Sequence, residues 1–219
     1  MLDRRTLLAG ALAWPLVSRA DAPRAVLFVG NSFTRWHDVA GRVAAVAAAE
    51  GAALDVTVVA VDGTTLAAKW AAPALRARMA ARDWDAVVLQ DYSTAALVPT
   101  MAARSAETVV SMARALAPAR VVLFETWARA AGHALYARPA MPRAPAAMQA
   151  AVAAHYDALA RTTAATVAPV GQRLTAAASR GEAVHGRDGH HASAEGAQLA
   201  ARVLWRTLAG VLDGRVATR

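Results

Sequence analysis

Residues 25–34 read AVLFVGNSFT, an unbroken apolar run that ends in a glycine and two small polar residues. An apolar run of this length, closed by turn residues, is typical of a strand that is buried on both faces of a parallel sheet. Gly-Asn-Ser is common in turns and at the first residues of helices. The stretch therefore predicts a first strand at residues 25–29, followed by a tight turn into a helix.

Further along the chain, short β-branched runs alternate with long alanine-rich segments. The other strands are expected at residues 54–61, 85–90, 120–125 and 166–170. Helices are expected near residues 38–50, 66–81, 101–117, 146–164, 171–180 and 193–212, and residues 128–145 predict one long loop. This alternation predicts a single α/β domain, a three-layer α/β/α sandwich with a five-stranded parallel sheet of flavodoxin-like type.

The composition excludes several classes of protein. Of the 219 residues 57% are hydrophobic and 62 are alanine, without the period of a coiled coil or of collagen. The net charge is +8, but the arginines are scattered singly, so nucleic-acid binding is not expected. Because the chain contains no cysteine, it forms no disulfides, and any nucleophile must be oxygen-based.

The N-terminal segment has the pattern of an export signal. Residues 1–22 read MLDRRTLLAGALAWPLVSRADA, in which paired arginines precede a short apolar run and small residues follow. This order is typical of a cleaved signal, and the arginine pair resembles the twin-arginine type. The apolar run is shorter than a membrane span needs. We therefore expect a periplasmic or secreted domain at residues 23–219, without a stable membrane anchor after cleavage.

Two segments carry residues with catalytic potential. Ser32 follows the first strand, where the carboxyl ends of parallel strands form ligand sites. Taken alone, a serine at this place is more often a helix N-cap or turn residue than a nucleophile. Asp188-Gly189-His190-His191 precedes the last expected helix, for which Ser193 is a plausible N-cap. An aspartate three residues before a histidine can orient the imidazole, as a serine hydrolase requires. The alternatives are a solvated loop or a metal site, since His185, Asp188, His190 and His191 are all possible ligands.

Taken together, the two segments resemble the SGNH/GDSL hydrolase superfamily over most of residues 25–212. The resemblance implies that Ser32 is the nucleophile, His191 the general base and Asp188 its orienting partner, with His190 as a neighbour. Asn31 stands where the family usually has an aspartate. The family needs no metal and no organic cofactor for this chemistry, so none is expected.

The resemblance also implies an oxyanion hole, which is formed by three groups. The backbone N–H groups of Ser32 and Gly63 supply two donors. The third family block, Gly-x-Asn-Asp, reads Gln90-Asp91-Tyr92-Ser93 here, so Gln90 is expected to supply the carboxamide in place of asparagine. One such donor can contribute on the order of a hundredfold in rate, so the substitution matters.

We expect Trp127 and Asn31 to contact the substrate, and either Trp36 or His37 could face the mouth of the site. The resulting hypothesis is an exported serine esterase that hydrolyses a small-molecule ester through an acyl-enzyme. Its acyl group is expected to be short, such as an acetyl group on a carbohydrate. The missing asparagine leaves open a non-catalytic ligand-binding protein with the same fold, and the His185–His191 cluster leaves open a metal-dependent hydrolase.

Overall fold

The computed structural model describes residues 22–214, so the expected signal segment lies outside the described residues except for Ala22. Five strands form one sheet in the spatial order β2–β1–β3–β4–β5, and all neighbouring strands are parallel. This is the flavodoxin-like order. The sequence-based prediction of the fold class is therefore confirmed. The strands are β1 (Arg24–Gly30), β2 (Leu54–Ala60), β3 (Ala86–Leu89), β4 (Arg120–Phe124) and β5 (Thr166–Ala168).

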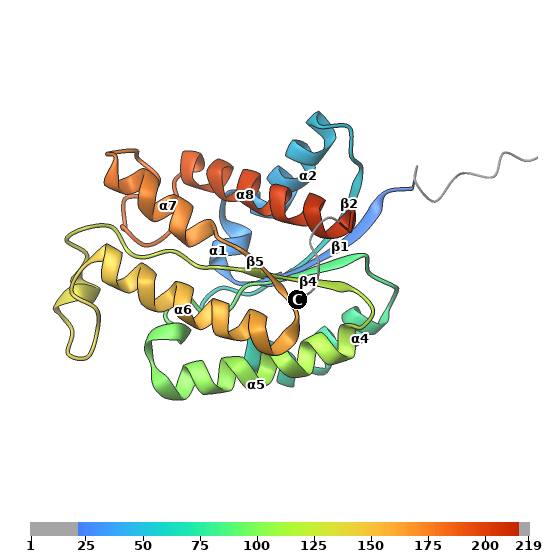
Figure 1. Cartoon of the computed structure of the whole chain (residues 1–219), viewed down its shortest axis with the longest axis horizontal. Coiled ribbons are helices and arrows are strands. Elements are labelled where there is room, and N and C mark those ends of the chain that lie inside the picture. Colours follow the sequence, from blue (N-terminus) through green and yellow to red (C-terminus); the bar gives the residue numbers. More distant parts are fainter. Residues whose placement is uncertain (1–21, 215–219) are drawn as a thin grey trace, which may run out of the picture.

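Helices cover both faces of the sheet (Figure 1). One layer contains α2 (Val39–Ala49), α7 (Val170–Ser179) and α8 (Ala194–Leu212). The other contains α3 (Leu66–Ala71), α4 (Pro73–Ala80), α5 (Pro99–Leu116) and α6 (Pro145–Thr163). Shorter turns are α1 (Ser32–Arg35), η1 (Trp36–Asp38), η2 (Ala95–Leu97) and η3 (Ala134–Ala137). Within the described residues, no helix combines the length and the apolar character that a membrane span requires.

The first strand shows why the sheet needs two covering layers. Val26 and Phe28 pack into the core on one face, and Leu27 and Val29 pack into the core on the other. All four side chains are fully buried. Since successive side chains of a strand point to opposite faces, an unbroken apolar run is stable only between two helix layers.

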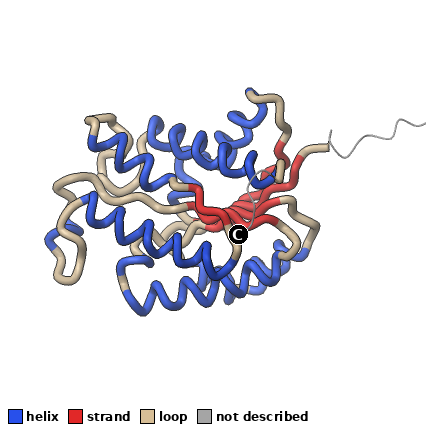
Figure 2. Tube along the Cα trace, in the orientation of Figure 1, coloured by secondary structure: helices blue, strands red, loops and turns tan. Residues whose placement is uncertain are grey.

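Two connections differ in detail from the sequence-based expectation. The helix expected over residues 66–81 is broken at Ala72, which is extended because proline at position 73 disfavours helical backbone in the residue before it. The long loop expected at residues 128–145 is present, with η3 inside it. Figure 2 shows that long loops gather at the end to which the strands point.

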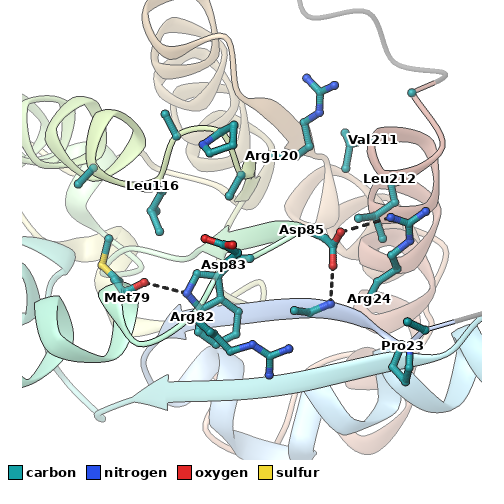
Figure 3. Close-up of a pocket in the computed structure, with 18 of the residues that line it drawn as sticks. Pro23, Arg24, Met79, Arg82, Asp83, Asp85, Leu116, Arg120, Val211 and Leu212 are labelled. Carbon is teal, nitrogen blue, oxygen red and sulfur yellow. Dashed lines mark hydrogen bonds and ion pairs between the residues drawn. The ribbon is translucent and has the colours of Figure 1, made fainter. Parts of the chain in front are cut away.

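A pocket lies at the other end of the sheet, where the strands begin (Figure 3). Arg24 and Asp85 pair across it at 3.3 Å, and Trp84 donates from Nε1 to the carbonyl of Met79 at 2.9 Å. Because Ser32 follows the carboxyl end of β1, this pocket is separate from the segments that carry catalytic potential.

Candidate active site

The turn after β1 is built to present Ser32. Asn31 caps α1, because its Oδ1 accepts a hydrogen bond from the N–H of Phe33 at 3.1 Å. Gly30 has no room for a side chain, since a Cβ atom would lie 2.0 Å from Oγ1 of Thr34. The chain therefore turns sharply after the strand, and Ser32 begins the helix at the carboxyl edge of the sheet.

Ser32, His191 and Asp188 form a continuous hydrogen-bonded chain. Nε2 of His191 lies 2.9 Å from Oγ of Ser32, and Nδ1 lies 2.6 Å from Oδ2 of Asp188. The two segments are 159 residues apart in sequence, and the fold brings them together. A hydroxyl, an imidazole and a carboxylate in this order can activate the hydroxyl as a nucleophile.

Asp188 is held as a carboxylate. Its Oδ1 accepts hydrogen bonds from the backbone N–H groups of His190 and His191, both at 2.9 Å. Burial raises the pKa of Asp188, but the hydrogen bonds from the His191 side chain and these N–H groups outweigh it and hold the pKa below its usual range. Since a carboxylate only accepts, the proton of the imidazole lies on Nδ1, and Nε2 can accept the hydroxyl proton of Ser32.

The imidazole of His191 is stacked between two other rings. The indole of Trp36 lies on one side with its centroid at 3.7 Å and an interplanar angle of 17°. The ring of His190 stacks on it as well, at 4.2 Å and 19°. Burial, with the positive charge of Arg129 adding to it, lowers the pKa of His190 to about 3. His190 is therefore neutral at pH 7 and packs beside the base as an aromatic ring.

Gln90 does not have the place that the resemblance implied. It is completely buried, and its Oε1 accepts from the N–H of Asn31 at 2.9 Å and from the hydroxyl of Thr34 at 3.0 Å. Because the Asn31 N–H is a donor, the atom that faces it must be the amide oxygen. The amide nitrogen donates to the carbonyl of Asp91. Gln90 thus fixes the turn that carries Ser32, and its expected role as an oxyanion donor is corrected.

Asn31 is likewise a scaffold residue and not a substrate contact. Besides capping α1, its amide nitrogen donates to the carbonyls of Thr64 at 3.3 Å and Asp91 at 3.4 Å. Only 2% of the residue is exposed. These bonds tie together the loops that follow β1, β2 and β3, so the expectation that Asn31 contacts substrate is corrected.

Trp127 is also buried, with no exposed surface. Its indole stacks on Phe33 at 4.0 Å, and its Nε1 donates to the carbonyl of His190 at 3.0 Å. Phe33 follows Ser32, and His190 precedes His191. Trp127 therefore links the turn that carries Ser32 (the serine turn) to the loop that carries His190 and His191 (the histidine loop). The expectation that it lines the substrate pocket is corrected.

Gly63 lies in an exposed turn after β2 with φ +68°, a conformation that favours glycine. Its neighbour Thr64 is bonded to Asn31, which places the turn beside the loop that carries Ser32. Among the described residues, no acceptor pairs with the Gly63 N–H. The donor is thus free for a ligand.

Arg129 is a charged residue near the site that the sequence-based reasoning did not single out. It is 5% exposed, its Nη2 donates to Oγ of Ser93 at 2.8 Å, and its guanidinium lies 5.6 Å from the Phe33 ring centroid. Within residues 22–214 its Nη1 has no hydrogen-bond partner. Burial lowers the pKa of Arg129 to about 10. The charge contributes to keeping His190 neutral. Its position shortly after the end of β4, at the edge of the sheet where ligands bind, is the signal that could have marked it.

The metal alternative involves a smaller set of residues than the sequence suggested. Ligand atoms of Asp188, His190 and His191 lie within 4.8 Å of one another. His185 instead faces the carbonyl of Ala128 with its Nε2, at 2.9 Å. A metal ion on His191 would compete with either Ser32 or Asp188, because both ring nitrogens already face these residues.

Comparisons with known proteins agree on the fold. No protein-family model and no curated protein matches the chain. Among solved structures, a candidate SGNH hydrolase from Slackia heliotrinireducens is 27% identical, with a TM-score of 0.74, over 85% of this chain and 100% of that chain.

Two more distant structures share the fold. A DUF4886 family protein from Bacteroides uniformis has a TM-score of 0.74 and 19% identity, over 85% of this chain and 83% of that chain. A lipase/acylhydrolase from Enterococcus faecalis has a TM-score of 0.66 and 18% identity, over 90% of this chain and 98% of that chain. The resemblance that the sequence suggested is therefore confirmed.

Proposed function

We propose that this chain, a member of the SGNH/GDSL hydrolase superfamily, is a serine esterase whose nucleophile is Ser32. The observation that carries the proposal is the hydrogen-bonded chain from Oγ of Ser32 through His191 to Asp188, at 2.9 and 2.6 Å. Its members come from distant segments of the sequence and meet at the carboxyl edge of the sheet, where α/β proteins of this type bind ligands.

The proposed reaction begins when His191 takes the hydroxyl proton of Ser32 on Nε2 while Oγ attacks the ester carbonyl. The carbonyl oxygen becomes negatively charged and is stabilised by the N–H groups of Ser32 and Gly63, which have no partner among the described residues. The imidazolium then donates its proton to the leaving alcohol. Water, activated by the same nitrogen, releases the acid from Ser32.

We further propose a short acyl group and an exported enzyme. Among the large apolar side chains of the described residues, only Trp36, Val58 and Val61 are exposed, and the others are buried or partly buried. This leaves little apolar surface on which a long acyl chain could lie, which favours a group such as acetyl. Export to the periplasm or beyond rests on the signal pattern of residues 1–22.

The test is hydrolysis of a chromogenic acetate ester by the purified chain and by Ser32→Ala. Ser111→Ala is the matched control, because Ser111 is exposed on α5 and bonds only to its own helix. We expect Ser32→Ala to lose at least about a thousandfold in kcat. A fluorophosphonate probe should modify Ser32 in the wild type and in the control variant.

Three results would contradict the proposal in different ways. Activity that survives Ser32→Ala would exclude Ser32 as the nucleophile. Activity that a chelator abolishes would favour a metal site on the Asp188–His191 cluster. Absence of both turnover and probe labelling, with an ester still bound, would favour a non-catalytic binding protein.

A further inference from the structure

Trp36 is the one large aromatic side chain among the described residues that is exposed, with 41% of its surface accessible. Its indole is stacked on the imidazole of His191. Exposing an indole to water is unfavourable in free energy, and exposed apolar groups next to a site commonly contact a ligand. The proposed reaction does not use Trp36, so its position needs a separate explanation.

Polar contacts hold the indole in place. Its Nε1 donates to Oδ2 of Asp62 at 3.2 Å. The carboxylate of Asp62 accepts from Nε of Arg35 on Oδ1 at 2.8 Å and from Nη2 on Oδ2. The hydrogen bond from Arg35, with a smaller one from Trp36, lowers the pKa of Asp62 to about 2 against the opposing effect of partial burial. Asp62 is therefore charged, and an ion pair lies beside the indole.

The backbone next to Trp36 is strained. His37 and Asp38 both have left-handed backbone angles, with φ of 56° and 49°, although neither is glycine. Each such residue costs about 1 kcal/mol. Backbone strain of this kind is concentrated at functional sites, where surrounding contacts over-determine the conformation. Here the two residues end the turn that carries Trp36 and lead into α2.

The chemistry of the proposed reaction indicates which part of the substrate lies near Trp36. The imidazolium of His191 must give its proton to the oxygen of the leaving alcohol. The alcohol portion of the ester therefore lies against the edge of the His191 ring during the reaction. Because Trp36 is stacked on that ring, its exposed surface borders the space that the alcohol occupies.

Resting on the proposed esterase function, we propose that Trp36 is the stacking surface of the alcohol subsite, and that Arg35 and Asp62 select a polyhydroxylated ring such as a pyranose. The C–H face of a sugar ring packs on the negative face of an indole. Its hydroxyl groups can both donate to Asp62 and accept from Arg35. An alkyl alcohol would remove water from this ion pair without replacing the lost hydrogen bonds.

The test compares three esters with the same acyl group: methyl 6-O-acetyl-glucopyranoside, hexyl acetate and ethyl acetate. Each is assayed with the wild type, Trp36→Ala and Trp36→Phe, and kcat and KM are measured separately. We expect Trp36→Ala to lower kcat/KM for the sugar ester about tenfold more than for ethyl acetate, mainly through KM. Trp36→Phe keeps an aromatic face and should restore most of that difference.

The outcomes separate this inference from the esterase proposal. Equal losses on all three esters would mean that Trp36 only positions His191, and the subsite proposal would be wrong. A loss concentrated on hexyl acetate would overturn the assignment to sugars. Failure of the esterase proposal shows independently, as absence of Ser32-dependent turnover of every ester by the wild type. Thermal unfolding of both variants checks that they are folded.

Discussion

Oε1 of Gln90 lies 2.9 Å from the backbone nitrogen of Asn31, the residue that precedes Ser32. The same oxygen accepts the hydroxyl of Thr34, on the other side of Ser32, at 3.0 Å. A single buried amide oxygen, from the residue that follows β3, thus holds both sides of the turn that carries Ser32, the serine turn. The position of the proposed nucleophile depends on a neighbouring strand as well as on its own.

Gln90→Ala should therefore destabilise the protein and misplace Ser32. Loss of the acceptor leaves a buried N–H and a buried hydroxyl without a partner, which costs about 1–3 kcal/mol. Gln149→Ala is the matched control, because Gln149 is also buried and its side-chain oxygen also accepts a backbone N–H, that of Ala128 at 2.9 Å, but it makes no hydrogen bond to the serine turn. We expect similar losses in unfolding free energy, and a larger loss of kcat for Gln90→Ala. Equal losses of kcat would refute the positioning role.

Gly63→Ala tests the proposed oxyanion donor. A Cβ atom on Gly63 would meet no other atom within 4 Å, so the cost is the strain of the left-handed backbone, about 1–2 kcal/mol. Gly51→Ala carries the same strain, at φ +82° with open space around it, before β2 at the far end of the sheet. Chemical denaturation should give similar losses for the two variants. Alanine keeps the backbone N–H, but relaxation of the left-handed backbone at position 63 turns that N–H away from the oxyanion, so only Gly63→Ala should lower kcat, by roughly tenfold or more. A kcat loss in both variants, or in neither, would count against the donor role.

The sequence predicts the layers well because a local pattern encodes them. The apolar run of residues 25–29 and its counterparts give all five strands, and Ser193 caps α8 as expected, with its Oγ accepting from the N–H of Gly196. The pairing of Ser32 with His191 agrees with what the family resemblance implied, because the loop before α8 brings His191 to the edge of the sheet where β1 ends.

The roles of Gln90, Asn31 and Trp127 do not follow from the sequence. A residue type near a strand end shows which hydrogen bonds it can make, but not whether they point into the site or beneath it. The side-chain oxygen of Gln90 already accepts two hydrogen bonds from the serine turn, and the indole of Trp127 is covered by the ring of Phe33. These roles depend on contacts between segments that are far apart in the chain, and a local sequence pattern does not record such contacts.

Trp127→Phe should loosen the histidine loop more than it destabilises the fold. The change keeps a ring for Phe33 to stack on, but it removes the 3.0 Å hydrogen bond to the carbonyl of His190. Trp205→Phe is the matched control, since Trp205 is also buried and donates to Glu50 at 2.7 Å within the α2–α8 layer. Calorimetry should show comparable losses of about 1–2 kcal/mol. Steady-state assays should show a loss of kcat for Trp127→Phe alone, and a loss of equal size in Trp205→Phe would contradict the link to His190.

Lys69, the single lysine of the chain, is buried below the turn that carries Gly63. Its Nζ donates to the carbonyls of Thr64 at 3.2 Å and Thr65 at 3.4 Å. Burial lowers the pKa of Lys69 from 10.5 to about 8, and the nearby Asp91 carboxylate opposes this only in part.

The depressed pKa predicts that stability rises with pH in the alkaline range. Between about pH 8 and 10.5 the unfolded chain keeps the Lys69 proton while the folded chain has lost it. Because the unfolded state then binds more protons, the free energy of unfolding increases with pH, by on the order of 2 kcal/mol across this window. Lys69→Met removes this group and leaves the other titrating residues in place. The difference in unfolding free energy, wild type minus Lys69→Met, should therefore rise from pH 8 to 10.5 when both are denatured with urea. A difference that stays constant or falls would show that burial does not penalise the Lys69 ammonium.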